Sequence, residues 1–225
     1  MNIVLVHPAG SNWVPGQTDF TPIANRMAPL GLLSMAAWLR ERHHRVHVYD
    51  CLAWDRPRPQ PAVVRDILDR QPDLVGFSAT TSGFLDGYGL AETIKQQRPE
   101  IKTVFGGVHV SAIGAPLLKA FPAIDFLCMG EGEATLAELA DGAPPADITG
   151  LIWRDDGRVV TNPRRPLLPD LDQMPFPAYD LLWGFPRRYH LPLFSYIKRP
   201  GATMVTSRGC PYKCSYCDRS VFKQG

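Results

Sequence analysis

Three cysteines lie close together near the C-terminal end of the sequence, in the stretch TSRGCPYKCSYCDR. Cys210, Cys214 and Cys217 have the spacing C-x3-C-x2-C, which puts three thiolates on one short loop. Three thiolates can hold an iron–sulfur cluster of four irons and leave one iron open to a substrate or cofactor. The spacing therefore favours a cluster with an open iron.

Zinc is the alternative occupant of this loop. A zinc site needs a fourth ligand, for which His190 or Asp218 is a candidate. Structural zinc sites usually pair their cysteines in two separated knuckles, whereas this loop has one group of three. We therefore rank the cluster above zinc.

The other two cysteines, Cys51 and Cys128, stand alone in apolar, strand-like surroundings. A disulfide framework would spread its cysteines through a short secreted chain, but this chain groups three of its five cysteines in one loop. We expect Cys51 and Cys128 to be small buried apolar side chains and not metal ligands.

Length and composition limit the class of protein. The chain has 225 residues, 45% of them apolar, which is enough for one full domain and a smaller part. A net charge of +2, without a run of five like charges, argues against a nucleic-acid surface. The N-terminus has no signal-peptide pattern, and no run of eighteen apolar residues could span a membrane. We expect a cytoplasmic protein.

Alternating strand and helix patterns precede the cysteine loop. Five nearly continuous apolar strands with helices between them predict a doubly wound parallel sheet, for which we expect the flavodoxin-like strand order 2-1-3-4-5. The expected strands are Asn2–His7, Val46–Tyr49, Leu74–Ser78, Thr103–Phe105 and Asp125–Met129. The expected helices are Leu30–Arg42, Ala62–Arg70, Phe84–Gln97, Ala112–Ala120 and Ala134–Ala140.

The carboxyl ends of these strands carry small and hydroxyl residues. Open parallel sheets bind ligands at this edge, at the point where the strand order reverses. Glycines let the backbone approach a ligand, and hydroxyls supply hydrogen bonds. Tight turns into the helices are the alternative explanation for each loop taken alone. The predicted cofactor contacts are Ser78, Thr80, Gly106, Gly107, His109, Gly130, Glu131 and Gly132.

Two further segments follow this region. Residues 148–161 predict a β-hairpin turning at Asp156-Gly157. The proline-rich stretch after it predicts a connector that packs through Phe176, Tyr179 and Trp183. Ala202–Thr206 predicts a short strand whose carboxyl end leads into the cysteine loop. We expect a doubly wound domain at 1–142, the hairpin and connector at 143–200, and the start of another domain at 201–225.

The cysteine motif resembles that of a known family. CPYKCSYC, at residues 210–217, matches the CxxxCxxC motif of radical S-adenosylmethionine enzymes, including an aromatic residue, Tyr216, before the third cysteine. Upstream, PLGLLSMAAWLRERHHRVHVYD, GGVHVSA, GEGE and the hairpin followed by DLDQMPFPAYDLL are similar to the N-terminal half of the cobalamin-binding subgroup of that family. The resemblance covers nearly the whole chain.

The resemblance implies three cofactors. Cys210, Cys214 and Cys217 would ligate a [4Fe–4S] cluster whose fourth iron binds S-adenosylmethionine, with Tyr216 near the adenine. Reductive cleavage then gives a 5′-deoxyadenosyl radical, which abstracts hydrogen from an unactivated substrate carbon. In the subgroup, cobalamin on the doubly wound domain commonly delivers a methyl group to that carbon. A small-molecule substrate and an electron donor such as a flavodoxin or ferredoxin are implied as partners.

The sequence departs from the family pattern in two places. The D-x-H-x-x-G motif that supplies a histidine to cobalt is absent, which leaves His109 as a candidate cobalt ligand. The alternative, which we favour, is a polar residue that closes its loop or caps the next helix. Only eight residues follow Cys217, too few for the partial (β/α)6 barrel of the family. We therefore expect an incomplete, truncated barrel and a fragment that is inactive alone.

Two functions compete on this sequence. The first is the N-terminal part of a cobalamin-dependent radical S-adenosylmethionine enzyme, a C-methyltransferase or a relative that performs similar radical chemistry. The second is a cobalamin-binding or scaffold module whose cysteine loop is vestigial or binds zinc. For the corrinoid site, we expect a bulky residue in place of Gly107 to block binding without unfolding the domain.

Overall fold

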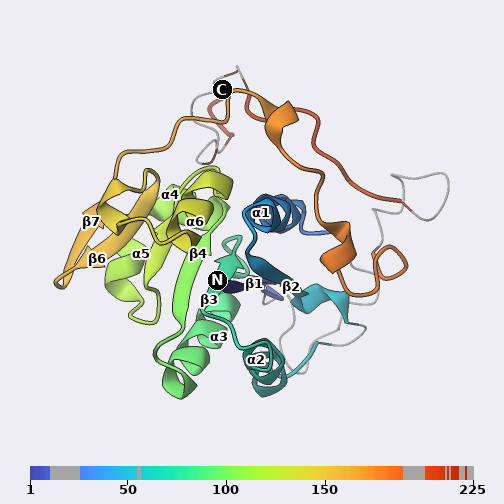
Figure 1. The fold of residues 1–225 in the computed structure, drawn as a ribbon, viewed down its shortest axis with the longest axis horizontal. Helices are drawn as coiled ribbons and strands as arrows, with labels where there is room; N and C mark the ends of the chain where they lie inside the picture. The colour runs from blue at the N-terminus through green and yellow to red at the C-terminus, as the bar shows by residue number, and fades with distance from the viewer. Residues whose placement is uncertain are drawn as a thin grey trace.

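Seven strands form one sheet in the order β2-β1-β3-β4-β5-β6-β7. Figure 1 labels each of these strands except β5. The structure is a computed structural model that describes residues 1–10, 26–54, 57–189, 201–210, 212, 214–217 and 221. The first five strands are parallel, which confirms the predicted flavodoxin-like order. The strands are β1 (Asn2–His7), β2 (Arg45–Asp50), β3 (Leu74–Ser78), β4 (Lys102–Gly106), β5 (Phe126–Cys128), β6 (Leu151–Asp155) and β7 (Arg158–Thr161).

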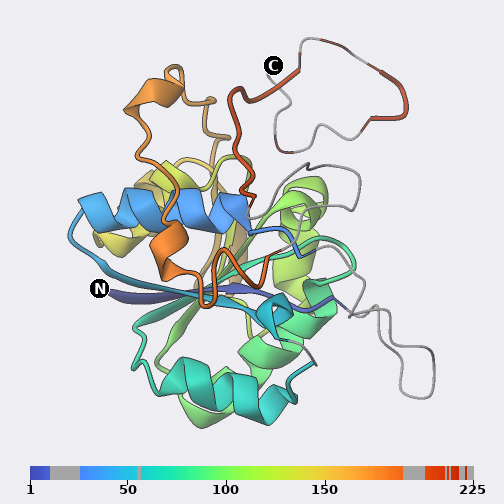
Figure 2. The same ribbon diagram turned by 90° about the vertical axis from the view of Figure 1, so that its right-hand side faces the viewer.

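Helices cover both faces of this sheet. In Figure 2 the blue helix α1 lies above the strands, and the teal and green helices α2 and α3 lie below them. Buried side chains of α1 and α6 share one apolar cluster, and those of α2 to α5 share the cluster on the opposite face. The helices are α1 (Leu30–Glu41), α2 (Gln60–Leu68), α3 (Phe84–Gln97), α4 (Val108–Ile113), α5 (Ala115–Ala120) and α6 (Glu133–Ala140).

Strand side chains alternate between the two clusters because successive residues of a strand point to opposite faces. On β1, for example, Val4 and Val6 face α2 and α3, whereas Ile3 and Leu5 face α1. Both faces are apolar, as expected for a parallel sheet covered on both sides. No helix in the described part of the chain has the length and apolar character that crossing a membrane requires.

Phe105 lies at the centre of the core on the α3 side. It is fully buried, and its ring stacks on Phe77 at 4.6 Å between centroids and meets the edge of Phe84 at 5.7 Å. Phe105→Ala should lower the free energy of unfolding by about 3–5 kcal/mol, measured by urea titration. Phe176 is 91% exposed and gives the matched control, so Phe176→Ala should change stability by less than about 0.5 kcal/mol. Equal effects of the two changes would contradict this account of the core.

The helix expected at Ala112–Ala120 is wrong in one respect. The structure has two short helices there, α4 and α5, separated by Gly114. The backbone of Gly114 has φ +71°, which a continuing helix cannot contain, and Pro116 stands in the first turn of α5. Proline lacks the N–H that a helix interior needs, which also prevents one continuous helix here. The apolar pattern continues across Gly114, so by itself it predicted a single helix.

The predicted hairpin is confirmed and extends the sheet. Strands β6 and β7 are antiparallel around Asp156 and Gly157, both with positive φ. Because β6 pairs with β5, the predicted domain division at residue 142 falls within one continuous sheet.

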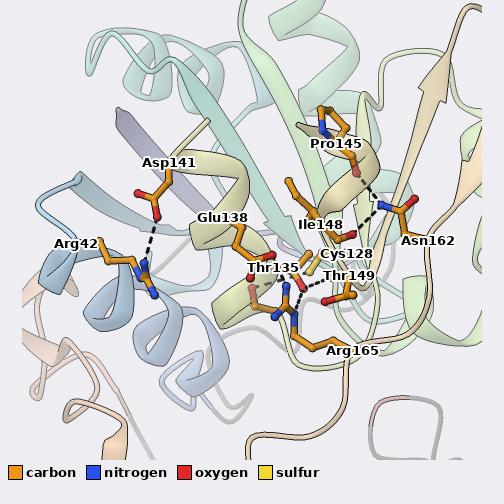
Figure 3. A network of polar contacts seen from close by, with 11 residues as sticks. Arg42, Cys128, Thr135, Glu138, Asp141, Pro145, Ile148, Thr149, Asn162 and Arg165 are labelled. Carbon is orange, nitrogen blue, oxygen red and sulfur yellow. Dashed lines mark hydrogen bonds and ion pairs between the residues drawn. The ribbon is translucent and has the colours of Figure 1, made fainter. Parts of the chain in front are cut away.

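Polar contacts fix the chain after this hairpin, as Figure 3 shows. Asn162 Nδ2 donates to the carbonyl oxygens of Pro145 at 2.6 Å and Ile148 at 2.7 Å. Arg165 donates to Thr135 Oγ1 at 3.0 Å and forms an ion pair with Glu138. These contacts hold the start of the connector against α6.

The connector packs partly as expected. Trp183 stacks on Trp54 with centroids 4.3 Å apart, and Tyr179 stacks on Phe185 at 4.7 Å beside the α1 cluster. The expectation for Phe176 is wrong, because its side chain is almost fully exposed. An aromatic residue among prolines does not by itself reveal which side of the chain meets the core.

The strand expected at Ala202–Thr206 is also absent. Residues 201–210 have no regular secondary structure. The hydroxyl of Tyr179 donates to the carbonyl oxygen of Thr203, which ties this segment to the connector. A strand is stabilised by ladder hydrogen bonds to a neighbour, and the described part of the chain provides no such neighbour here.

Candidate functional site

A cavity of about 690 Å³ opens at the carboxyl edge of the sheet. It lies between the first turns of α1, the ends of β1, β3 and β4, the Gly130–Glu133 turn before α6 and the segment from Val205 to Cys210. The strand order reverses at β1, which has β2 on one side and β3 on the other. The cavity therefore occupies the place where open parallel sheets bind ligands.

Seven of the predicted cofactor contacts line this one cavity. They come from three loops that are far apart in sequence: Ser78, Thr80, Gly106, Gly107, Gly130, Glu131 and Gly132. Parallel strands bring their carboxyl ends to one edge, which explains why the loops meet. Their role in binding stays a prediction.

The two neighbouring glycines after β4 have different structural roles. A Cβ on Gly106 would meet only Cys128, with its carbonyl oxygen at 3.5 Å and its Cβ at 3.8 Å. Gly106 thus leaves room that a side chain would fill. Gly107 has φ +97°, and a Cβ there would lie 2.9 Å from the carbonyl oxygen of Ala79. A bulky residue at Gly107 would strain the backbone, so the expectation that it would leave the fold intact is wrong.

His109 does not line the cavity. Its Nδ1 lies 3.2 Å from Thr81 Oγ1, and its ring packs on Phe84 with centroids 4.6 Å apart. Burial lowers the pKa of His109, which favours the neutral ring. His109 follows Val108 on α4, and of these two it is Val108 that lines the cavity. The structure therefore supports the alternative of a polar residue that closes the loop.

Among the described residues, His7 is the histidine that lines the cavity; its place at the carboxyl end of a strand was expected, but it was not among the predicted contacts. Its Nδ1 lies 2.9 Å from Asp50 Oδ1, across the β1–β2 register that pairs the two residues. Asp50 is buried and also accepts hydrogen bonds from the Tyr189 hydroxyl and the Leu52 N–H, both at 3.0 Å. Burial and the Asp50 charge raise the pKa of Tyr189, so its hydroxyl remains a donor. The Asp50 carboxylate at Nδ1 fixes the orientation of the His7 ring.

Two carboxylates of the GEGE turn bind an arginine that precedes the cysteines. Arg208 donates to Glu131 Oε1 at 3.0 Å and to Glu133 Oε1 at 2.7 Å, and all three side chains line the cavity. The second oxygen of Glu131 accepts from the Leu168 N–H at 2.7 Å. Burial lowers the pKa of Arg208, but the hydrogen bonds and charges of Glu133 and Glu131 outweigh burial and raise it. Both oxygens of Glu131 are thus already engaged within the protein.

Neither Arg208 nor Glu133 was among the predicted contacts, although Glu133 belongs to the GEGE turn that was expected at this edge. The sequence contains one signal for this pairing. Glu131 and Glu133 alternate with glycines, and Arg208 precedes a glycine, so each charge stands among small or apolar residues. Such charges pair when they are buried. The sequence gives no means of telling which segments meet.

The three predicted metal ligands lie at the rim of the cavity or beyond it. Cys210 and Cys217 line the cavity, whereas Cys214 does not, and all three are exposed. Within the described residues, no three potential ligands are gathered around one point. Thiolates repel one another until a metal neutralises them, so a site of this kind is seldom preformed.

Tyr216 is 91% exposed and away from the cavity lining. The alternative zinc ligands His190 and Asp218 lie outside the described residues.

The two isolated cysteines are buried, as predicted. Burial raises the pKa of Cys51 to about 12, and burial likewise raises the pKa of Cys128 to about 12. Metal ligation requires the thiolate, and these thiols stay protonated at neutral pH. Cys128 lines the cavity as an apolar group.

Comparison with known proteins identifies the family. A family model described as B12 binding domain matches residues 17–140, which is more than half of the chain. The chain belongs to the B12-binding domain family. The match covers β2 to β5 and the loops after β3, β4 and β5 that line the cavity, whereas β1 and residues 205–210 lie outside it. It agrees with the resemblance to cobalamin-binding radical S-adenosylmethionine proteins, which is confirmed.

Curated relatives extend the similarity beyond this domain. The B12-binding domain chain is 36% identical over 199 residues to an uncharacterized methyltransferase, PH0819, of Pyrococcus horikoshii, with 86% of the chain and 41% of that protein covered. It is 28% identical over 231 residues to the anaerobic magnesium-protoporphyrin IX monomethyl ester cyclase of Rubrivivax gelatinosus, with 99% of the chain and 39% of that protein covered. The chain spans about two fifths of the length of these relatives.

A solved structure shares the fold of this B12-binding domain. It is the radical S-adenosylmethionine methyltransferase TsrM from Kitasatospora setae, with cobalamin and a [4Fe-4S] cluster bound. The TM-score is 0.57 at 21% identity, over 78% of the chain and 31% of TsrM. At this identity the likeness shows the fold alone.

Proposed function

We propose that the chain binds cobalamin in the cavity and forms the cofactor-binding part of a radical S-adenosylmethionine methyltransferase. One observation carries the proposal: the cavity of about 690 Å³ is lined both by the loops of the B12-binding domain and by Cys210 and Cys217. A corrinoid and an iron–sulfur cluster would therefore share one space. Methylation is favoured over cyclisation because the 36% identical relative is named a methyltransferase.

The residues of the cavity fit a corrinoid. Gly106 leaves an open wall at the end of β4, and Leu5, Val104 and Leu136 make an apolar inner surface. Ser78 and Thr80 supply hydroxyls at the edge, where a phosphate or amide of the nucleotide tail would accept or donate hydrogen bonds. The His7 ring also lines the cavity, in a position held by Asp50.

The second set of residues would hold the cluster. Cys210, Cys214 and Cys217 would supply three thiolates and leave the fourth iron for S-adenosylmethionine. When bound, the cofactors supply radical formation and methyl transfer, while the protein positions them and excludes water. An electron donor such as a flavodoxin or ferredoxin and a small-molecule substrate complete the proposal.

A titration with hydroxocobalamin tests this function directly. We expect the 225-residue chain to retain about one corrinoid per molecule after gel filtration, detected by its visible absorption bands, because a preformed apolar cavity with few polar groups is typical of cofactor sites. Albumin carried through the same steps controls for adsorption. Absence of retained corrinoid from a chain that is folded by circular dichroism, at high micromolar ligand, would leave the scaffold function as the better account.

A further inference from the structure

Three buried charges connect the cysteine segment to the B12-binding domain. Arg208 stands two residues before Cys210, Glu131 belongs to the turn that leads into α6, and Glu133 is the first residue of α6. Their side chains are 15%, 8% and 10% exposed. No other ion pair that the structure gives for residues 201–210 reaches the sheet or its helices.

The geometry uses the special shape of arginine. One terminal nitrogen of Arg208 binds Glu131 at 3.0 Å and the other binds Glu133 at 2.7 Å. A planar fork can bridge two carboxylates in this way, whereas the ammonium group of lysine acts as a single point charge. The backbone N–H of Leu168 holds Glu131 from the other side at 2.7 Å, which orients its carboxylate toward Arg208.

The same three side chains form part of the wall of the cavity. A ligand that fills the cavity excludes water from them, and ion pairs strengthen when water is excluded. Cys210 and Cys217 also line the cavity, and Cys210 is two residues from Arg208, so a cluster bound there would also order the segment that carries Arg208. Each ligand would therefore stabilise the arrangement that favours the other.

We propose that Arg208 acts as a latch that couples the two cofactor sites, so that loading the cysteine loop tightens corrinoid binding and the reverse. The inference rests on the proposed function, because cobalamin is taken as the occupant of the cavity. Arg208 is a positioning residue: it acts by holding the cysteine segment against Glu131 and Glu133. Coupling between two binding sites is reciprocal, and a factor of about 5 to 150 is typical.

The experiment measures hydroxocobalamin affinity of the chain before and after anaerobic reconstitution with iron and sulfide. Reconstitution should tighten binding by about fivefold or more. Arg208→Met should reduce this ratio to about one, and Arg208→Lys should give an intermediate ratio, because lysine cannot bridge both carboxylates. A ratio in Arg208→Met equal to that of the parent would overturn the proposal.

Arg165→Met is the matched control. Arg165 also pairs with a glutamate of α6, Glu138, but it lies outside the cavity lining, and the hydrogen bonds and ion pairs described for it go to Thr135 and Glu138. Its removal should keep the parent ratio. The triple variant Arg208→Met, Glu131→Gln, Glu133→Gln avoids unpaired buried carboxylates, so it separates loss of the latch from loss of stability. It should also give a ratio of about one.

A second measurement keeps the latch testable without any cofactor. Limited proteolysis with thermolysin, which can cleave at Met204 and Val205, should be several-fold faster in Arg208→Met than in the parent, and unchanged in Arg165→Met, because a segment that is no longer docked reaches a protease more readily. If the chain fails to bind corrinoid, the proposed function fails, while this measurement still decides whether Arg208 docks the segment. Equal cleavage rates in Arg208→Met and the parent would refute the latch itself.

Discussion

Gly106→Leu should leave the protein folded and weaken hydroxocobalamin binding by roughly 10- to 100-fold, which corresponds to the usual cost of overpacking a filled pocket. Gly106 ends β4 on the cavity wall, and a Cβ there meets its nearest neighbours at 3.5 and 3.8 Å, which is ordinary contact. The added side chain therefore occupies ligand space without displacing the backbone. Binding is measured by equilibrium dialysis, and folding by circular dichroism.

A graded series controls for this prediction. Gly106→Ala adds only the Cβ and should weaken binding much less than Gly106→Leu. Gly107→Leu should lower the free energy of unfolding instead, because φ +97° and the 2.9 Å approach to Ala79 leave no room for a Cβ. If Gly106→Leu binds corrinoid as tightly as the parent, the occupant does not lie against β4.

Cys214→Ala should reduce iron uptake to background, from about four irons per chain in the reconstituted parent. Removing one of three thiolates leaves too few protein ligands to retain a cluster. Iron and sulfide analysis, with absorption near 400 nm, measures the loss. The same result is expected for Cys210→Ala and Cys217→Ala.

The isolated cysteines provide the matched controls. Cys51→Ala and Cys128→Ala should keep the parent iron content, because burial raises the pKa of both thiols to about 12 and neither is a thiolate at neutral pH. Stoichiometric zinc without iron in the parent chain would support the zinc alternative and contradict the cluster.

Local patterns explain what could be predicted about the fold. Continuous apolar strands and amphipathic helices determine a covered parallel sheet, because each residue's neighbours along the chain already indicate which face must be buried. The hairpin at Asp156-Gly157 was predictable for the same reason, since the turn chemistry is local. The break at Gly114 was not, because a glycine within an apolar repeat is compatible with either a continuous or a divided helix.

Contacts between distant segments explain what the sequence left undecided. The sequence placed both His7 and His109 at the ligand edge and favoured His109 as the contact, but a side chain at the start of a helix turns with that helix, and the structure puts His7 at the cavity. The sequence predicted Glu131 as a ligand contact, whereas in the structure its carboxylate accepts a hydrogen bond from Arg208, 77 residues away along the chain. Pairing of this kind depends on which loops meet at the sheet edge.

The sequence alone therefore determined the doubly wound class and the loops that carry glycine and cysteine, because these follow from periodicity and from spacing within a few residues. The order of the first five strands was chosen as the flavodoxin-like one, and the family was inferred from the resemblance of the cysteine motif. The tertiary structure decided which of those residues share a wall. It joined Gly106, Glu131 and Cys210 around one cavity and turned His109 away from it. The physical reason is that the direction of a side chain at a loop depends on how the elements on both sides pack. The sequence of the loop itself does not determine that packing.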